Sequence, residues 1–358
     1  MGGIATAVAL AAAGTAALGI ETVVISPGDR DANTAVAGGY RARVIEGPAA
    51  HAGEIYASPN RVDAGTRLSR AMFDAISAEY GDRRVRLIVH SEELAVLLVS
   101  AASAPWCEQP LAFSHGLTAQ EHPGRDELTE QQQTFFAAAR LVFVASESQR
   151  ALAERLYPAT CFRCLALPLC LLVDELAPRR CDIAHRVPGY LLAAGRAVPQ
   201  KGFDILLRAL AMVAEGRGLH LDLFLGHGEQ AVLRQCADLA APLGDRVRIE
   251  SWSSRHVLLN AIAHAAAVVV PSRFEPLGII AAEALALQTP VIATRIGGLA
   301  ELLEPVKGTI LVDPGDDGVR PHQLAAALTS LPVAPWEIDG SQRLKSYSLA
   351  RFGEALNL

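Results

Sequence analysis

Strand-length apolar runs alternate with helix-length segments throughout the second half of the chain. Such alternation predicts parallel strands joined by crossover helices, with helices on both faces of the sheet. We therefore expect a Rossmann-like domain of six strands in this half. The predicted strands are residues 190–194, 219–225, 247–250, 268–270, 291–294 and 309–312, and the predicted helices are 203–215, 230–240, 255–264, 279–287, one ending at 303, and 323–331.

The first half carries a looser version of the same pattern. Polar residues follow its predicted strands, at His90, at Ser114-His115-Gly116 and at Ser146. Because parallel strands end at one edge of their sheet, this placement indicates a second doubly wound sheet with polar groups along that edge. The predicted helices are 4–18, 68–80, one from 94, and 149–156; the predicted strands are 21–26, 85–89, 110–113, 141–145 and 165–173, and residues 27–67 are expected to be rich in loops.

Residues 267–287 concentrate the candidate chemistry. A strand ends at Pro271, a polar loop carries Glu275, and Gly278 opens an apolar helix that contains Glu283. The first amides of a helix have no intrahelical acceptor and suit an anion. A carboxylate in an apolar helix is unfavourable unless it meets a polar partner. The segment therefore predicts a ligand site, in which sugar or ribose hydroxyls bind the two glutamates.

Two cations, Arg196 and Lys201, follow the first predicted strand of the second half. The chain has only two other lysines, Lys307 and Lys345. A guanidinium, an ammonium and a helix N-terminus together suit a diphosphate, and they would stabilise charge on a departing nucleoside diphosphate as a metal ion would. The alternative is an ordinary surface pair that flanks a loop.

Composition and net charge argue against several classes of function. The 358-residue chain has a formal net charge of −6, which gives no electrostatic footprint for nucleic acid. Its six cysteines do not suggest a secreted disulfide scaffold. Cys161-x-x-Cys164 lacks a matching second pair, and Asp29-Arg30-Asp31 lacks neighbouring ligands. We therefore expect free cysteines, a solvated turn and no metal site.

The apolar opening, residues 4–20, has no basic leader and contains Gly14 and Gly19. A strand-like run follows it. We therefore expect a helix packed on a sheet, not a signal peptide or a membrane span, and a cytoplasmic protein without a membrane partner.

Several motifs of the second half occur in a fixed order. They are Gly195-Arg196-Ala-Val-Pro-Gln-Lys201-Gly202, Gly226-His-Gly228, Pro271-Ser272-x-x-Glu275-Pro276-x-Gly278 with Glu283 eight residues after Glu275, and Gly297-Gly298. In this the chain resembles the retaining glycosyltransferases of GT-B fold, most closely glycosyltransferase family 4, the glycosyl transferases of group 1. The resemblance covers nearly the whole chain, and its first half matches through Gly2-Gly3, the strand end at His90 and Ser114-His115-Gly116.

The resemblance implies a role for each matched position. The catalytic set is Arg196 and Lys201 on the donor diphosphate, Glu275 on the transferred sugar, and His115 near the sixth carbon of that sugar, where it orients the acceptor. Glu283 would hold the ribose hydroxyls. The implied backbone contacts are Gly3, which closes over the diphosphate from the first domain, Gly226 with the turn at 253–255 near the base, and Gly278, Ile279 and Ile280, whose amides meet the phosphate and the sugar.

The implied reaction transfers a sugar from a nucleotide-diphosphate sugar, with a UDP-sugar as the favoured donor, to a hydroxyl of a small soluble acceptor. The anomeric configuration is retained, and attack occurs on the front face while a donor phosphate oxygen takes the acceptor proton. In such a mechanism the protein positions the reactants and stabilises the leaving group. Neither a metal nor a further cofactor is implied.

The implied architecture is α/β, with two Rossmann-like doubly wound domains that face each other across a cleft. We expect an acceptor-side domain over residues 1–180, a donor domain over 187–338, and a C-terminal helix over 339–358 that crosses back to the first domain. In this family a central strand precedes the Gly-Gly loop, which here follows Met1 directly. Either residues precede Met1, or the first sheet has a gap that another segment fills. We expect the former, and the role of Gly3 depends on it.

Other functions stay open at this stage. A nucleotide-sugar epimerase or a glycan phosphorylase could share the fold, although the two cations and two glutamates favour transfer. A non-catalytic nucleotide-sugar binder or partner subunit is a different class. A third class is a membrane-surface transferase with a lipid acceptor, because arginines recur between residues 61 and 86 and could form a basic patch.

Overall fold

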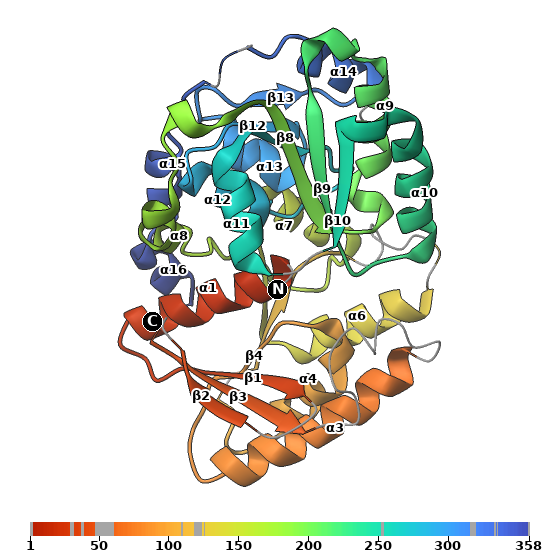
Figure 1. Cartoon of the computed structure of the whole chain (residues 1–358). Helices are drawn as coiled ribbons and strands as arrows, with labels where there is room; N and C mark the ends of the chain where they lie inside the picture. The colour runs from red at the N-terminus through yellow and green to blue at the C-terminus, as the bar shows by residue number, and fades with distance from the viewer. Residues whose placement is uncertain are drawn as a thin grey trace. The chain divides into compact units, whose positions relative to one another are not determined.

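The computed structural model divides into two compact units. The N-terminal unit contains Val8–Leu167 and Leu349–Leu358, and the C-terminal unit contains Met1–Ala7 and Pro168–Ser348. Figure 1 shows the elements of both units. The structure describes residues 3–28, 32–36, 39–46, 61–108, 110–117, 124, 126–251, 254–315, 320–332, 334 and 336–356.

The sheet of the C-terminal unit has six parallel strands in the order β10-β9-β8-β11-β12-β13. Chain order reverses between β8 and β11, which is the switch point of a Rossmann-like sheet, where open α/β folds bind ligands. The Rossmann-like prediction for this half is therefore confirmed. Its strands are β8 Val187–Arg196, β9 His220–Gly226, β10 Val247–Ser251, β11 Ala265–Val270, β12 Val291–Thr294 and β13 Ile310–Val312.

Helices cover both faces of this sheet (Figure 1). Alternate residues of β8, such as Leu191 and Ala193, share one buried cluster with Phe203, Leu206 and residues of two further helices. The opposite face is covered where α11 contacts β8 and β11, and α12 contacts β11 and β12. The helices are α8 Cys170–Leu176, α9 Phe203–Met212, α10 Gln230–Ala240, α11 Arg255–His264, α12 Ile279–Ala286, α13 Gly297–Leu303, α14 Pro321–Thr329 and α15 Ser341–Lys345.

The described strands of the N-terminal unit form two sheets where we expected one. Parallel strands follow the order β4-β5-β6-β7, and a separate sheet has the order β1-β3-β2, in which β2 is antiparallel to β3. The strands are β1 Val23–Gly28, β2 Ala32–Ala35, β3 Arg41–Glu46, β4 Ile88–Val89, β5 Leu111–Ser114, β6 Leu141–Val144 and β7 Phe162–Cys164.

Several boundaries in this unit differ from the prediction. The segment predicted as loop contains β2 and β3: β2 has only four residues, two of them alanine, and β3, with the sequence RARVIE, has only two β-branched residues. The strand predicted at 165–173 is wrong: the chain forms β7 before it and begins α8 at Cys170, and Pro168 between them has no N–H for a sheet ladder. The helices of this unit are α3 Arg61–Tyr80, α4 Ala95–Ala102, α6 Asp126–Ala138, α7 Glu147–Leu156 and α16 Leu349–Leu356, and the boundary between the units falls inside α1 Gly3–Ala17, after Ala7.

The C-terminal tail forms two helices where we expected one. Helix α15 lies in the C-terminal unit, and α16 returns to the N-terminal unit. The break falls at Ser346-Tyr347-Ser348, where the Tyr347 carbonyl accepts a hydrogen bond from the Cys170 amide at 3.3 Å. Helix α16 is held by the completely buried Phe352 and by Arg86, whose Nη1 donates to the Leu356 carbonyl at 3.1 Å.

The loop after β8 passes so close to the loop after β11 that only glycine fits at position 202. Gly202 has φ +65°, and a Cβ there would lie 2.0 Å from the carbonyl oxygen of Pro271. Gly218 has nearly the same φ, +62°, but open space around it. We expect Gly218→Ala to lose about 1–2 kcal/mol from left-handed strain. Gly202→Ala should lose clearly more, because the two loops must also separate.

Thermal unfolding of both variants beside the wild type measures this difference. Equal losses of thermal midpoint in Gly202→Ala and Gly218→Ala would show that the approach of the two loops is not tight.

Candidate functional site

Three loops meet where the sheet order of the C-terminal unit reverses. They follow β8, β11 and β12 at their carboxyl ends, where parallel strands present a ligand-binding edge. The Arg273 amide donates to the Gln200 carbonyl at 2.7 Å, and the Gly298 amide donates to the Glu275 carbonyl at 3.1 Å. A Cβ at Gly298 would lie 2.1 Å from the Pro276 carbonyl oxygen. The glycines of the motifs therefore permit close packing of backbone against backbone.

Lys201 and Glu275 contact each other directly. The Lys201 ammonium donates to Glu275 Oε2 at 2.6 Å, and the Ser272 hydroxyl donates to the same oxygen at 3.2 Å. The Glu275 side chain is 9% exposed and the Lys201 side chain 23%. A carboxylate buried to this degree requires a positive partner, and Lys201 provides it. The sequence predicted both residues at the site but not their ion pair.

Arg273 holds the loop that carries Lys201. Its guanidinium binds both carboxylate oxygens of Asp204 at 2.8 Å and donates to the Pro199 carbonyl at 2.8 Å. Burial alone would raise the pKa of Asp204, but the hydrogen bonds from Arg273 bring it below its ordinary value. The sequence analysis missed this role of Arg273. Its position inside the Pro271–Pro276 motif was the available signal.

Arg196 is the exposed last residue of β8, beside the end of β9. It pairs in the sheet with Gly226, the last residue of β9. Within the described residues, the Arg196 guanidinium forms no ion pair with a carboxylate and donates no hydrogen bond. This distinguishes it from Lys201: its charge is available to an anion at the strand ends without breaking an existing contact.

Helix α12 begins at the same edge. Gly278 precedes it with φ +90°, and a Cβ there would lie 2.5 Å from Leu299 Cδ2, so a side chain would be both strained and crowded. The Gly278 carbonyl accepts the Ala282 amide at 3.0 Å. The amides of Ile279 and Ile280 lie ahead of that bond in the first turn, and so have no intrahelical acceptor. They suit the anionic group that the sequence analysis assigned to them.

Glu283 has a partner that the sequence analysis did not foresee. The residue lies in α12 and is 5% exposed. Arg255, at the start of α11, donates from Nε at 3.2 Å and from Nη2 at 3.0 Å, both to Glu283 Oε1. Burial raises the pKa of Glu283, and the charge of Arg255 opposes that rise. Arg255 lies in the turn that the sequence analysis placed near the nucleotide base.

His115 of the N-terminal unit forms a pair with His90. The Nδ1 of His90 and the Nε2 of His115 are 3.1 Å apart, so a single proton joins them. Both rings also pack on Phe113, at centroid distances of 5.2 and 4.7 Å. Burial lowers the pKa of His90 to about 4, and burial together with His90 lowers the pKa of His115. The pair is therefore neutral at pH 7.

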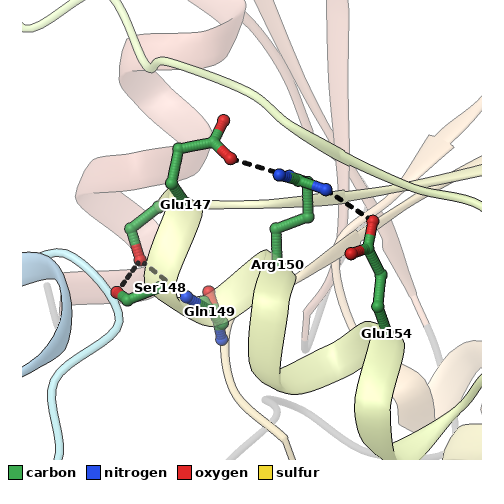
Figure 2. Close-up of polar contacts among 6 residues, drawn as sticks. Glu147, Ser148, Gln149, Arg150 and Glu154 are labelled. Carbon is green, nitrogen blue, oxygen red and sulfur yellow. Dashed lines mark hydrogen bonds and ion pairs between the residues drawn. The ribbon is translucent and has the colours of Figure 1, made fainter.

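The polar residues that follow β6 contact one another in the first turns of α7. Ser146 caps α7 by accepting from the Gln149 amide at 3.3 Å. The Arg150 guanidinium donates hydrogen bonds to the carboxylates of Glu147 at 2.7 Å and Glu154 at 2.6 Å. Figure 2 shows these contacts along the first turns of α7. Ser146 and its neighbours therefore stabilise the start of α7.

The remaining predictions concern metals and membranes. The described residues contain no cluster of three or more histidine, cysteine or acidic side chains that could hold a metal ion. None of the six cysteines forms a disulfide bond within the described residues. Gly2, Asp29 and Asp31 lie outside the described residues, and Gly3 is the first residue of α1. Within the described ranges, every helix is too short or too polar to span a bilayer.

Fold and site together define an α/β protein with an anion-ready edge at the switch point of a Rossmann-like sheet. Residues 188–331 match the family described as Glycosyl transferases group 1. The predicted resemblance to the glycosyl transferases of group 1 is thus confirmed over this part of the chain. It includes every C-terminal position that the sequence analysis placed in the donor site, from Arg196 to Glu283.

Curated relatives match part of the chain. One similar protein is D-inositol 3-phosphate glycosyltransferase 1 of Catenulispora acidiphila, 38% identical over 157 residues, which cover 40% of this chain and 36% of the relative. The D-inositol 3-phosphate glycosyltransferase of Geodermatophilus obscurus is 33% identical over 223 residues, which cover 58% and 48%. The chain thus spans less than half the length of these relatives.

Solved structures resemble the chain over almost its whole length. Sucrose-phosphate synthase from Thermosynechococcus elongatus has a TM-score of 0.73 at 23% identity, and the match covers 99% of this chain and 92% of the other. At that identity the likeness speaks for the fold alone. The predicted α/β, GT-B fold class is confirmed.

The His90–His115 pair predicts how stability depends on pH. The pKa of His90 is about 4 in the folded chain and about 6.5 when exposed. As pH falls from 6.5 toward 4, the unfolded chain takes up a proton that the folded chain does not, so folding loses stability across that window. His90→Phe, which keeps the packing on Phe113, should reduce the fall in thermal midpoint over this range.

Melting curves from pH 4 to pH 7 measure this effect. The exposed His322, changed to glutamine, is the matched control and should leave the wild-type profile in place. A His90→Phe profile that runs parallel to the wild type would contradict the assignment.

Proposed function

We propose that the chain is a retaining glycosyltransferase that moves a sugar from a nucleoside diphosphate sugar, with UDP as the favoured nucleotide, to a hydroxyl of a small acceptor. The observation that carries this proposal is the Lys201–Glu275 ion pair at 2.6 Å, beside the unpaired Arg196 and the start of α12. A cation, a carboxylate and free amides at one sheet edge match the diphosphate and the hydroxyls of such a donor.

Donor binding exchanges partners within the ion pair. The donor diphosphate binds Arg196, the Lys201 ammonium and the amides of Ile279 and Ile280. Sugar hydroxyls then donate to Glu275 and replace the hydrogen bond that Lys201 made. The buried carboxylate therefore keeps hydrogen-bond donors in both states, which avoids the large penalty of an unpaired buried charge.

The transfer step breaks the bond between the anomeric carbon and the diphosphate oxygen, and forms the bond to the acceptor oxygen on the same face. The acceptor proton passes to the departing phosphate oxygen. Arg196, Lys201 and the α12 amides stabilise the negative charge that grows on the leaving group. No protein nucleophile is used, and the proposed step requires no metal ion or further cofactor.

The other assigned residues position the reactants. Glu283 accepts from the ribose hydroxyls, while Gly226 and the turn before α11 lie by the base. His115 orients the sugar and the acceptor, and Gly3 contacts the diphosphate. The His90–His115 pair supports this role for His115, because His90 occupies Nε2 of His115 and leaves its Nδ1 for a hydroxyl group, which can both donate and accept.

The acceptor is a small hydroxylated molecule in this proposal. The names of the curated relatives support it, since they act on D-inositol 3-phosphate. A soluble acceptor also distinguishes the chain from a membrane-surface transferase. Co-sedimentation with anionic lipid vesicles at low salt is the observation that would favour the lipid alternative.

A donor screen decides between transfer and mere binding. UDP-, ADP- and GDP-sugars are incubated with the protein in EDTA, with and without inositol phosphates or hexose phosphates, and released nucleotide is measured. We expect release from a UDP-sugar that rises with acceptor. A thermal shift with UDP but no release from any donor would identify a non-catalytic binder.

The variants Arg196→Gln and Lys201→Ala test whether each cation contributes to turnover, to thermal stability or to both. Both should lower turnover about 10²–10³-fold, the usual effect of removing one group that stabilises a developing charge. Their thermal midpoints should differ. Among the described residues Arg196→Gln removes no ion pair or side-chain hydrogen bond, so this variant should melt like the wild type, whereas Lys201→Ala leaves Glu275 buried without its cation and should melt lower.

The control variant is Arg150→Gln, which removes exposed ion pairs to Glu147 and Glu154 in α7 of the N-terminal unit. It should keep both turnover and thermal midpoint close to those of the wild type. Wild-type turnover in Arg196→Gln or in Lys201→Ala would contradict the diphosphate assignment.

A further inference from the structure

Arg255 is a basic side chain inside the donor site to which no motif assigns a role. It opens α11, and its side chain is 21% exposed. Its guanidinium lies between two carboxylates: Nη1 donates to Glu175 Oε1 at 2.5 Å, while Nε and Nη2 donate to Glu283 Oε1. All three residues belong to the C-terminal unit. One cation therefore links the buried glutamate of α12 to the half-exposed glutamate of α8.

The two carboxylate oxygens of Glu283 differ in the hydrogen bonds that they accept. Oε1 accepts two N–H groups from Arg255 at 3.2 and 3.0 Å, which occupy its usual acceptor directions. No donor from the described part of the chain reaches Oε2. A second ligand that donates hydroxyl groups to Glu283 must therefore bind at Oε2.

Arg255 is itself held in one orientation. The bond to Glu175 fixes one end of the planar guanidinium, and such a fork loses little freedom when it binds. The carboxylate it faces lies in a helix whose neighbouring Ala282 and Ala284 are completely buried. Glu283 thus has no other side chain in its own helix turn to direct its carboxylate.

We propose that Arg255 is a positioning residue for donor specificity, which turns Glu283 so that Oε2 accepts the ribose hydroxyls and the chain thereby selects ribonucleotide donors over deoxy forms. This inference rests on the proposed function, because Glu283 holds the ribose only if the chain binds a nucleoside diphosphate. It adds to that function a role for Arg255 and a preference for ribonucleotides that binding measurements can detect.

The opposite role is an outcome of the test. Arg255 could compete with the ribose by occupying Glu283, and its removal would then strengthen the preference for hydroxyls. Removal of the Glu175 carboxylate should weaken a positioning role only a little, because the Arg255 guanidinium keeps both of its bonds to Glu283 Oε1 without it.

The experiment compares the binding of UDP and 2′,3′-dideoxy-UDP by calorimetry. Hydrogen bonds to a charged acceptor contribute about 1.5–3 kcal/mol, so the wild type should prefer UDP by roughly tenfold to a hundredfold. Arg255→Gln should bring the ratio of the two dissociation constants to within about threefold of unity. Glu175→Gln should keep most of the wild-type preference.

Arg248→Gln is the matched control. Arg248 also binds a carboxylate through two nitrogens, at 3.2 and 2.9 Å to Asp222, but it lies on β10 at the start of the strand. Its loss should leave the ratio unchanged, which excludes a general effect of breaking an arginine–carboxylate pair. If Arg255→Gln does not fold, Arg255→Lys replaces it, because lysine keeps the charge but not the two N–H groups on Oε1.

The outcomes separate cleanly. An Arg255→Gln or Arg255→Lys protein that keeps the wild-type ratio overturns the inference and leaves the proposed function intact, and so does a ratio that increases. A wild type that binds UDP but does not prefer it to 2′,3′-dideoxy-UDP overturns the ribose role of Glu283. A wild type that binds none of UDP, ADP and GDP overturns the proposed function, and this inference with it.

Discussion

The close approach of two loops at the switch point of the C-terminal sheet makes the rest of the site possible. The chain after β8 and the chain after β11 come near enough for the Pro271 carbonyl to lie where a side chain at position 202 would be. Arg273 fastens them by binding Asp204 across the gap. Only then can Lys201 reach Glu275, so the ion pair is a consequence of backbone packing.

Two buried carboxylates in this unit meet two different cations, and the difference has chemical consequences. Glu275 is paired with Lys201, a single point charge on a flexible stem that can turn toward a phosphate. Glu283 is paired with Arg255, a rigid fork that a third residue, Glu175, holds in place. The first arrangement suits a group that changes partners during the proposed reaction. The second suits a group that must stay in one orientation.

The N-terminal unit uses its strand ends in contrasting ways. The residues after β6 form hydrogen bonds within the first turns of α7 and stabilise the start of that helix. After β4 and β5, His90 and His115 share one proton, and burial favours the neutral form of both. A polar residue after a strand therefore marks an edge of the sheet, but only its contacts determine whether its side chain is free to meet a substrate.

The sequence by itself determined the α/β class, the strands of the C-terminal unit, its helices between residues 203 and 331 and the motif positions, because apolar periodicity and glycine at fixed spacing are local properties. Local pattern failed at β2 and β3, and at residues 165–173, where the apolar run favoured a strand but contains Pro168, which has no N–H for a sheet ladder. Only the tertiary structure decided that Lys201 binds Glu275, that Arg273 anchors their loops and that Arg255 binds Glu283. These contacts join residues 28 to 74 positions apart, and no periodicity connects such positions until the sheet order brings their strand ends together.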